Sequence, residues 1–64
     1  MNTNIFICQL SKNQQLYIKE KIYNYLIQEE YDENYINECI SNVMDDRVVN
    51  IEDIVNINEL QEVA

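Results

Sequence analysis

The chain has 64 residues, of which twelve are acidic and four are basic, for a formal net charge of −8, and it contains no His, Gly or Pro. At this length it forms at most one domain with a small core. Without His it lacks the commonest general acid–base and the usual zinc ligand, and without Gly it lacks the usual phosphate-binding loop. We therefore expect no enzyme activity, no metal site and no cofactor.

The charge is divided unevenly along the chain. Residues 1–28 carry three lysines and one acid, for a net charge of +2, whereas residues 29–64 carry eleven acids and one base, Arg47, for −10. A segment this negative repels nucleic acid and anionic membranes and attracts basic protein surfaces. We therefore expect no direct binding to nucleic acid, because its phosphates are neutralised by Lys and Arg.

Neither a membrane span nor a secretion signal is recognisable in the sequence. No apolar run approaches the ~18 residues that cross a bilayer. The first residues lack the basic region and the long apolar region of a signal peptide. The sequence therefore predicts a cytoplasmic protein without membrane partners.

The two cysteines are isolated from each other and from other metal ligands. Cys8 and Cys39 do not form a CxxC motif, and the chain has no His to complete a zinc site. We expect both thiols to be buried as small hydrophobic groups. A single Cys8–Cys39 disulfide is the alternative.

The first elements are an arm and a long helix. Residues 4–8 are a short β-prone run without a clear partner strand, so we expect residues 1–10 to form an extended arm across the helices, with a short strand as the alternative. Ser11 and Gln14 have the spacing of a capping box. This motif predicts a helix over residues 12–28.

The helix over residues 12–28 has apolar side chains on two sides. The expected core face consists of Ile18, Ile22, Tyr25 and Leu26. The roughly opposite face consists of Leu16, Tyr23 and Ile27. Either the helix is central in the domain, or the second face contacts another molecule. In the second case Leu16, Tyr23 and Ile27 form a candidate homodimer face.

Two further helices are expected in the acidic half. Asp32 is a suitable N-cap for a helix over residues 33–45, and Asn50 for a helix over residues 51–57. The core-facing stripe of the former consists of Ile36, Cys39, Ile40 and Val43. The apolar residues from Ile51 onward recur every three positions and do not form one helical stripe. The sequence thus predicts a small all-α domain of three helices preceded by an arm.

The carboxylates of the acidic half are the candidate binding surface, and we expect them to face outward as one continuous patch. Such a patch could copy part of the charge pattern of a nucleic acid and occupy the nucleic-acid site of a larger basic protein. Tyr31 and Tyr35 would anchor it, since Tyr is enriched at interfaces. An ordinary solvated face, with tyrosines partly buried along helix edges, is the alternative. The candidate residues are Glu29, Glu30, Tyr31, Asp32, Glu33, Tyr35, Glu38, Asp45, Asp46, Glu52 and Asp53.

The run Glu29-Glu30-Tyr31-Asp32-Glu33, with the pairs Asp45-Asp46 and Glu52-Asp53, resembles the surfaces of small acidic phage-encoded inhibitors of bacterial defence. Anti-CRISPR proteins and other DNA mimics belong to this class. The resemblance is one of composition and size, without a family motif. It implies inhibition of a host nuclease, such as a CRISPR effector, in the bacterial cytoplasm. The alternative function is a homodimeric regulatory or anti-repressor module that binds a transcription factor through the helix over residues 12–28.

Overall fold

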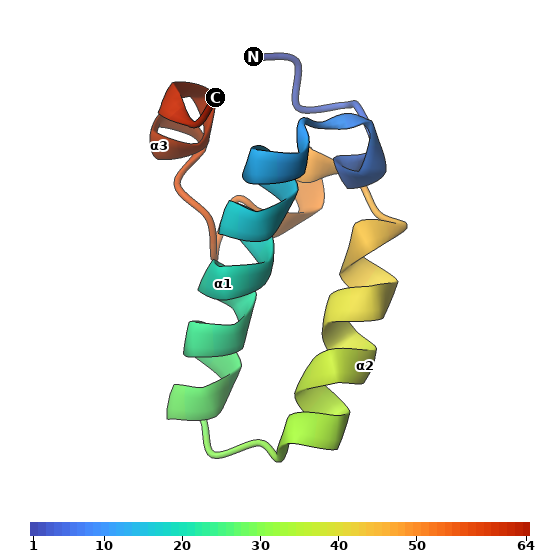
Figure 1. Cartoon of the computed structure of the whole chain (residues 1–64), viewed down its shortest axis with the longest axis vertical. Helices are drawn as coiled ribbons and strands as arrows, with labels where there is room; N and C mark the ends of the chain where they lie inside the picture. The colour runs from blue at the N-terminus through green and yellow to red at the C-terminus, as the bar shows by residue number, and fades with distance from the viewer.

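The computed structural model describes all 64 residues and confirms a small all-α domain. Three α-helices follow one another along the chain, α1 (Lys12–Gln28), α2 (Glu33–Met44) and α3 (Ile57–Glu62). Two short 3-10 helices, η1 (Ile7–Gln9) and η2 (Val48–Ile51), precede α1 and follow α2 (Figure 1). The first two α-helices therefore lie where the capping signals predict them.

Side-chain caps fix where α1 and α2 begin. The Ser11 hydroxyl accepts a hydrogen bond from the Gln14 N–H (3.1 Å), and the Gln14 side chain accepts one from the Ser11 N–H (3.2 Å). At the start of α2, the Asp32 carboxylate accepts a hydrogen bond from the Tyr35 N–H (2.8 Å). Both caps satisfy amide groups that have no partner inside the helix, so they define the boundaries locally.

The turn between α1 and α2 is a Schellman motif without glycine. The Glu30 N–H donates to the Ile27 carbonyl (3.1 Å), and the Tyr31 N–H donates to the Leu26 carbonyl (3.3 Å). This pattern requires a left-handed residue, and Glu30 takes that role with φ of 65°. The chain has no Gly to place there. The turn reverses the chain, so that α1 and α2 lie side by side as an antiparallel helical hairpin (Figure 1).

The third helix is displaced from its predicted position. The prediction of a helix over residues 51–57 with Asn50 as its N-cap is wrong. Asn56 is the N-cap instead, and its side chain accepts hydrogen bonds from the Asn58 and Glu59 N–H groups (2.9 and 3.3 Å). The chain upstream forms only η2 and a turn, which bury Val48, Ile51 and Val55. Apolar residues spaced three apart suit such tight turns better than one α-helical stripe.

The N-terminal arm pairs with the link that follows α2. Its Thr3 and Ile5 carbonyls accept hydrogen bonds from the Val49 and Val48 N–H groups (2.8 and 3.1 Å), and the Ile7 N–H donates to the Asp46 carbonyl (2.9 Å). A single antiparallel bridge joins Phe6 to Arg47, and η1 follows immediately. The arm therefore crosses the link after α2 and the start of η2, and it forms no regular strand.

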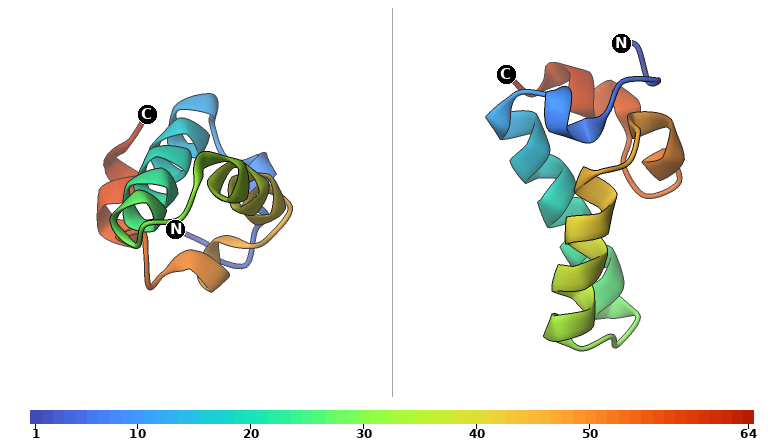
Figure 2. Two further views of the ribbon diagram at one scale, coloured as in Figure 1. Left: turned by 90° about the horizontal axis from the view of Figure 1, so that it is seen from below. Right: turned by 90° about the vertical axis from the view of Figure 1, so that its right-hand side faces the viewer.

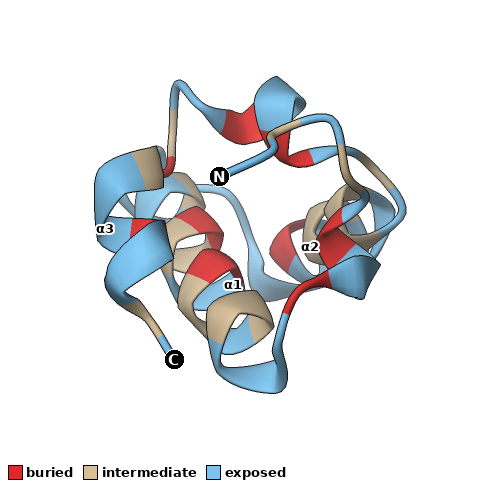
Figure 3. Cartoon of the chain, turned by 90° about the horizontal axis from the view of Figure 1, so that it is seen from above, coloured by how far each residue is buried: buried red, intermediate tan, exposed pale blue.

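The core lies at one end of an elongated molecule measuring 32 × 20 × 19 Å. Eight buried side chains form it, contributed by η1, α1, η2, α3 and the links between them (Figure 3): Ile7, Leu10, Ile18, Ile22, Val48, Ile51, Val55 and Leu60. Ile36 is the buried residue of α2. At the other end the α1–α2 hairpin projects alone, as Figures 1 and 2 show.

Several side chains differ in burial from the prediction. Tyr25 belongs to the expected core face of α1, but it is 48% exposed because no element covers that end of the helix. Leu16 and Ile27 are exposed and Tyr23 is half-buried, so the arm does not cover the second face of α1. Cys8 is exposed, Cys39 is half-buried and both thiols are free, which excludes the disulfide in this structure.

Candidate functional site

The carboxylates of the acidic half face solvent. Ten of the eleven belong to exposed residues, and Asp46 is half-buried. The hydrogen bonds of Glu33 and Glu59 come from neutral tyrosine hydroxyl groups, and that of Asp32 comes from a backbone N–H. Their negative charge therefore acts on the surroundings of the molecule.

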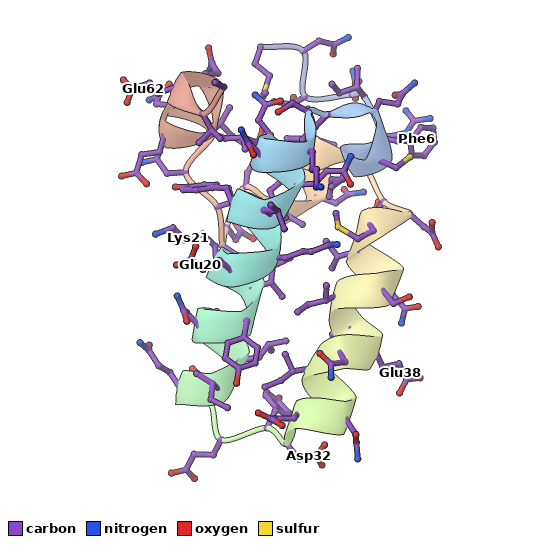
Figure 4. The ribbon with its side chains drawn as sticks, viewed as in Figure 1. Phe6, Glu20, Lys21, Asp32, Glu38 and Glu62 are labelled. Carbon is purple, nitrogen blue, oxygen red and sulfur yellow. The ribbon has the colours of Figure 1, made fainter.

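These carboxylates do not form the one continuous patch that the sequence predicts. Glu29, Glu30, Asp32 and Glu33 lie at the turn between α1 and α2, whereas Glu59 and Glu62 belong to α3 at the opposite end. Figure 4 shows Asp32 at the turn, Glu38 on the side of α2 that points away from α1, and Glu62 at the far end. The twelve residues of α2 separate the turn from Asp45 by about 18 Å. The predicted residues thus divide into groups.

The outer side of α2 carries the second group. Glu38 and Asp45 lie seven residues apart, which places them on the same side of the helix. They lie opposite Ile36, Ile40 and Val43, which are buried or half-buried. Asp32 does not continue this side, because it lies at the turn and caps the start of α2. Glu52 and Asp53 follow η2 and are exposed near the core end.

Asp46 has a structural role that the sequence reasoning missed. Its carboxylate accepts hydrogen bonds from the Asn50 side chain (2.6 Å) and from the Arg47 N–H (2.7 Å). These bonds and the nearby Arg47 guanidinium hold the pKa of Asp46 below its usual value. The Arg47 guanidinium also lies 4.9 Å from the centre of the Phe6 ring. Asp46 therefore fixes the start of η2 and is less available to a partner than Asp45.

The end of the hairpin carries a stacked pair of tyrosines. The rings of Tyr31 and Tyr35 are 4.7 Å apart between centroids with an interplanar angle of 19°, and each residue is 45% exposed. The Glu30 turn places Tyr31 ahead of the Asp32 cap, and the cap places Tyr35 in the first turn of α2. The Cys39 thiol and Tyr31 raise the pKa of Tyr35 above its ordinary value. The two rings therefore lie side by side at the end of the hairpin, and both are partly exposed.

Two other tyrosines join α1 to its neighbours. The Tyr23 hydroxyl donates a hydrogen bond to Glu33 of α2 (3.3 Å), and the Tyr17 hydroxyl donates one to Glu59 of α3 (2.6 Å). The bond to Glu59 raises the pKa of Tyr17 to about 12. Because Tyr23 contacts α2 in this way, the stripe of Leu16, Tyr23 and Ile27 is interrupted at its centre.

Comparison with protein-family models, with curated proteins and with solved structures finds no match to this chain. No helix combines the length and the apolar character that crossing a membrane requires. The molecular surface has no pocket, and Asp, Glu and Cys side chains nowhere gather in a group of three or more suited to a metal ion. The candidate binding groups on the surface are therefore its exposed carboxylates and its exposed apolar and aromatic side chains.

Proposed function

We propose that this chain is a binding protein without enzyme activity that occupies the nucleic-acid site of a larger, basic protein. The observation that carries the proposal is the exposure of ten carboxylates in a segment whose only base is Arg47. Arg47 lies against the Phe6 ring and beside Asp46. A surface of this kind steers a basic partner towards it and accelerates association at low salt.

The density of charge favours a partner that binds a single strand. A net charge of −8 over a length of 32 Å gives one charge per about 4 Å, compared with about 3.4 Å along one nucleic-acid strand and about 1.7 Å along a duplex. Proteins that bind single strands line a basic groove with aromatic side chains. The proposed partner is therefore a nuclease or another protein with such a groove.

The biological setting of the proposal follows from the resemblance to phage-encoded inhibitors. The chain would act in the cytoplasm of a bacterial host, against a nuclease such as a CRISPR effector. It would compete with the guide or target strand and carry out no chemistry itself. Glu38 and Asp45, which are exposed on the outer side of α2, suit a groove that accommodates one helix.

The test is affinity capture followed by competition. The full chain is immobilised and exposed to a bacterial lysate, and bound proteins are eluted with rising salt. We expect a nucleic-acid-binding protein that elutes with salt and loses a labelled single-stranded oligonucleotide when the chain is added. Capture of a partner whose oligonucleotide binding is unaffected by excess chain would contradict the proposal.

A second function has one observation in its favour. Leu16 is 51% exposed and Ile27 is 40% exposed on the outer face of α1, so the homodimer or anti-repressor module remains a candidate. Tyr23, between them, is half-buried and bonded to Glu33, which leaves a broken apolar stripe. A monomer in sedimentation equilibrium at high protein concentration would exclude the homodimer.

A further inference from the structure

The exposed apolar side chains concentrate at one end of the molecule. We define the hairpin tip as residues 25–35, the last turn of α1, the Schellman turn and the first turn of α2. The tip contributes half of the eight large hydrophobic side chains that the chain exposes: Tyr25, Ile27, Tyr31 and Tyr35. Because α3, η1 and η2 lie at the other end, no element of this chain covers the tip (Figures 1 and 2).

The tyrosine stack presents a defined surface to a partner. Tyr31 and Tyr35 are held 4.7 Å apart by the turn and the helix cap, so binding need not order them first. Exposed aromatic faces attract cations, and the planar guanidinium of Arg stacks on them better than the compact ammonium of Lys. The stack therefore favours arginine over lysine.

The charge of the tip excludes a second copy of the chain as the favoured occupant. Residues 25–35 contain four exposed carboxylates, Glu29, Glu30, Asp32 and Glu33, and no basic residue. Two tips in contact would oppose these charges to an identical set, which is unfavourable. A basic surface gains from the same charges, because carboxylates form short, strong hydrogen bonds with guanidinium groups.

We propose that the hairpin tip is the docking surface for an arginine side chain of the basic partner. The guanidinium lies over the Tyr31–Tyr35 stack, and neighbouring tip carboxylates accept its N–H groups. The inference depends on the proposed function for the identity of the partner, but it concerns a separate property, the preference for arginine. The inference also assigns two separate roles. The tip anchors one side chain of the partner, and Glu38 and Asp45 on the outer side of α2 supply long-range attraction.

The preference can be measured without knowing the partner. Two synthetic peptides of equal length, one with arginine and one with lysine alternating with serine, are titrated into the full chain at low salt and followed by amide chemical shifts. We expect the arginine peptide to bind at least fivefold more tightly and to shift resonances of residues 29–35. Equal affinities for the two peptides would overturn the inference.

Variants localise the effect. We expect Tyr31→Ala and Tyr35→Ala to abolish the arginine preference, and Tyr31→Phe, which keeps the ring, to retain it. Leu16→Ala, which removes an equally exposed apolar side chain outside the tip, is the matched control and should leave the preference unchanged. Far-UV circular dichroism verifies that each variant is folded. An arginine preference that survives in both alanine variants would contradict the assignment.

Further outcomes of these experiments distinguish the docking of arginine at the tip from the proposed function. Self-association that Tyr31→Ala and Tyr35→Ala abolish would show that a second copy occupies the tip, and would overturn the inference. If the peptides bind equally but the captured protein still loses its oligonucleotide to the chain, the docking assignment fails and the proposed function stands. If the arginine preference is present but the captured protein keeps its oligonucleotide, the docking assignment stands and the proposed function fails.

Discussion

The hydroxyl of Tyr17 and the carboxylate of Glu59 lie 2.6 Å apart and join the middle of α1 to α3. The bond stabilises the neutral tyrosine beside a negative charge, and it raises the pKa of Tyr17 to about 12 from an ordinary value of 10.0. Since α3 has only six residues, it is tied to the rest of the fold by few contacts: this bond, the hydrogen bond from the Gln14 side chain to the Leu60 carbonyl (3.3 Å) and the burial of Leu60. The hydrogen bond between Tyr17 and Glu59 therefore forms only when α3 is packed against α1.

Replacing Tyr17 with Phe should lower the melting temperature at neutral pH, because the hydrogen bond to Glu59 is lost. The stabilisation is present in full below pH 10 and disappears as the pH rises through the folded-state pKa of about 12. Thermal melts of the wild type and Tyr17→Phe should therefore converge between pH 10 and pH 12. A difference that does not change over this interval would contradict the assigned bond.

The left-handed turn residue predicts a stabilising substitution. Glu30→Gly should raise the free energy of unfolding by about 1 kcal/mol, because a residue with a Cβ is strained at positive φ and Gly is not. Glu29→Gly is the matched control: it removes the same charge from a residue with φ of −82°, and it should not stabilise. Urea denaturation measures both. Equal effects of the two substitutions would show that charge, and not backbone conformation, is responsible.

The N-cap of α3 can be tested by substituting two nearby asparagines, Asn56 and Asn58, one at a time. Asn56→Ala should destabilise the fold by about 1 kcal/mol, because the side chain satisfies two N–H groups at the helix start. Asn58→Ala removes an exposed side chain from the same helix, and it should change stability by less than about 0.5 kcal/mol. Similar losses in both variants, measured by urea denaturation, would rule out Asn56 as the cap.

The position of the core predicts which leucines matter. Leu60 is buried, and Leu60→Ala should cost about 2–5 kcal/mol, which is enough to unfold a domain of marginal stability. Leu16 is half-exposed on α1, and Leu16→Ala should cost less than about 0.5 kcal/mol. Circular dichroism at room temperature distinguishes these outcomes. A folded Leu60→Ala variant of near wild-type stability would contradict the observed core.

The sequence contains enough information for the parts of the fold that local chemistry determines. The capping box at Ser11 and the cap at Asp32 predict α1 and α2 because each is satisfied within three residues. The position of α3 depends on burial of Val48 and Val55 against other elements, which no local signal reveals. The capping potential of Asn50 therefore predicts a helix over residues 51–57, whereas α3 begins only at Ile57.

The sequence predicts which types of residue form the candidate site, but it predicts their arrangement in space only partly. Solvent exposure follows from the carboxylates themselves, because charged groups are seldom buried. Their division between the two ends follows from the hairpin geometry. The role of Asp46 depends on Asn50 four residues later, a spacing that sequence periodicity does not identify as a hydrogen bond. The stack of Tyr31 on Tyr35 depends likewise on the left-handed Glu30.

The central claim is that the carboxylates along α2 occupy a basic nucleic-acid site. The direct measurement is the displacement of a single-stranded oligonucleotide from the captured partner by the double variant Glu38→Lys and Asp45→Lys, which spares the structural Asp46. The control is Glu20→Lys with Glu62→Lys, which changes the net charge equally on sides away from the outer face of α2 (Figure 4). We predict at least a tenfold loss of competition for the first variant and a much smaller loss for the second. Equal losses of competition in the two variants would show that net charge, and not the position of the carboxylates on α2, determines binding, and would contradict the claim. Unchanged competition by both variants would contradict it as well.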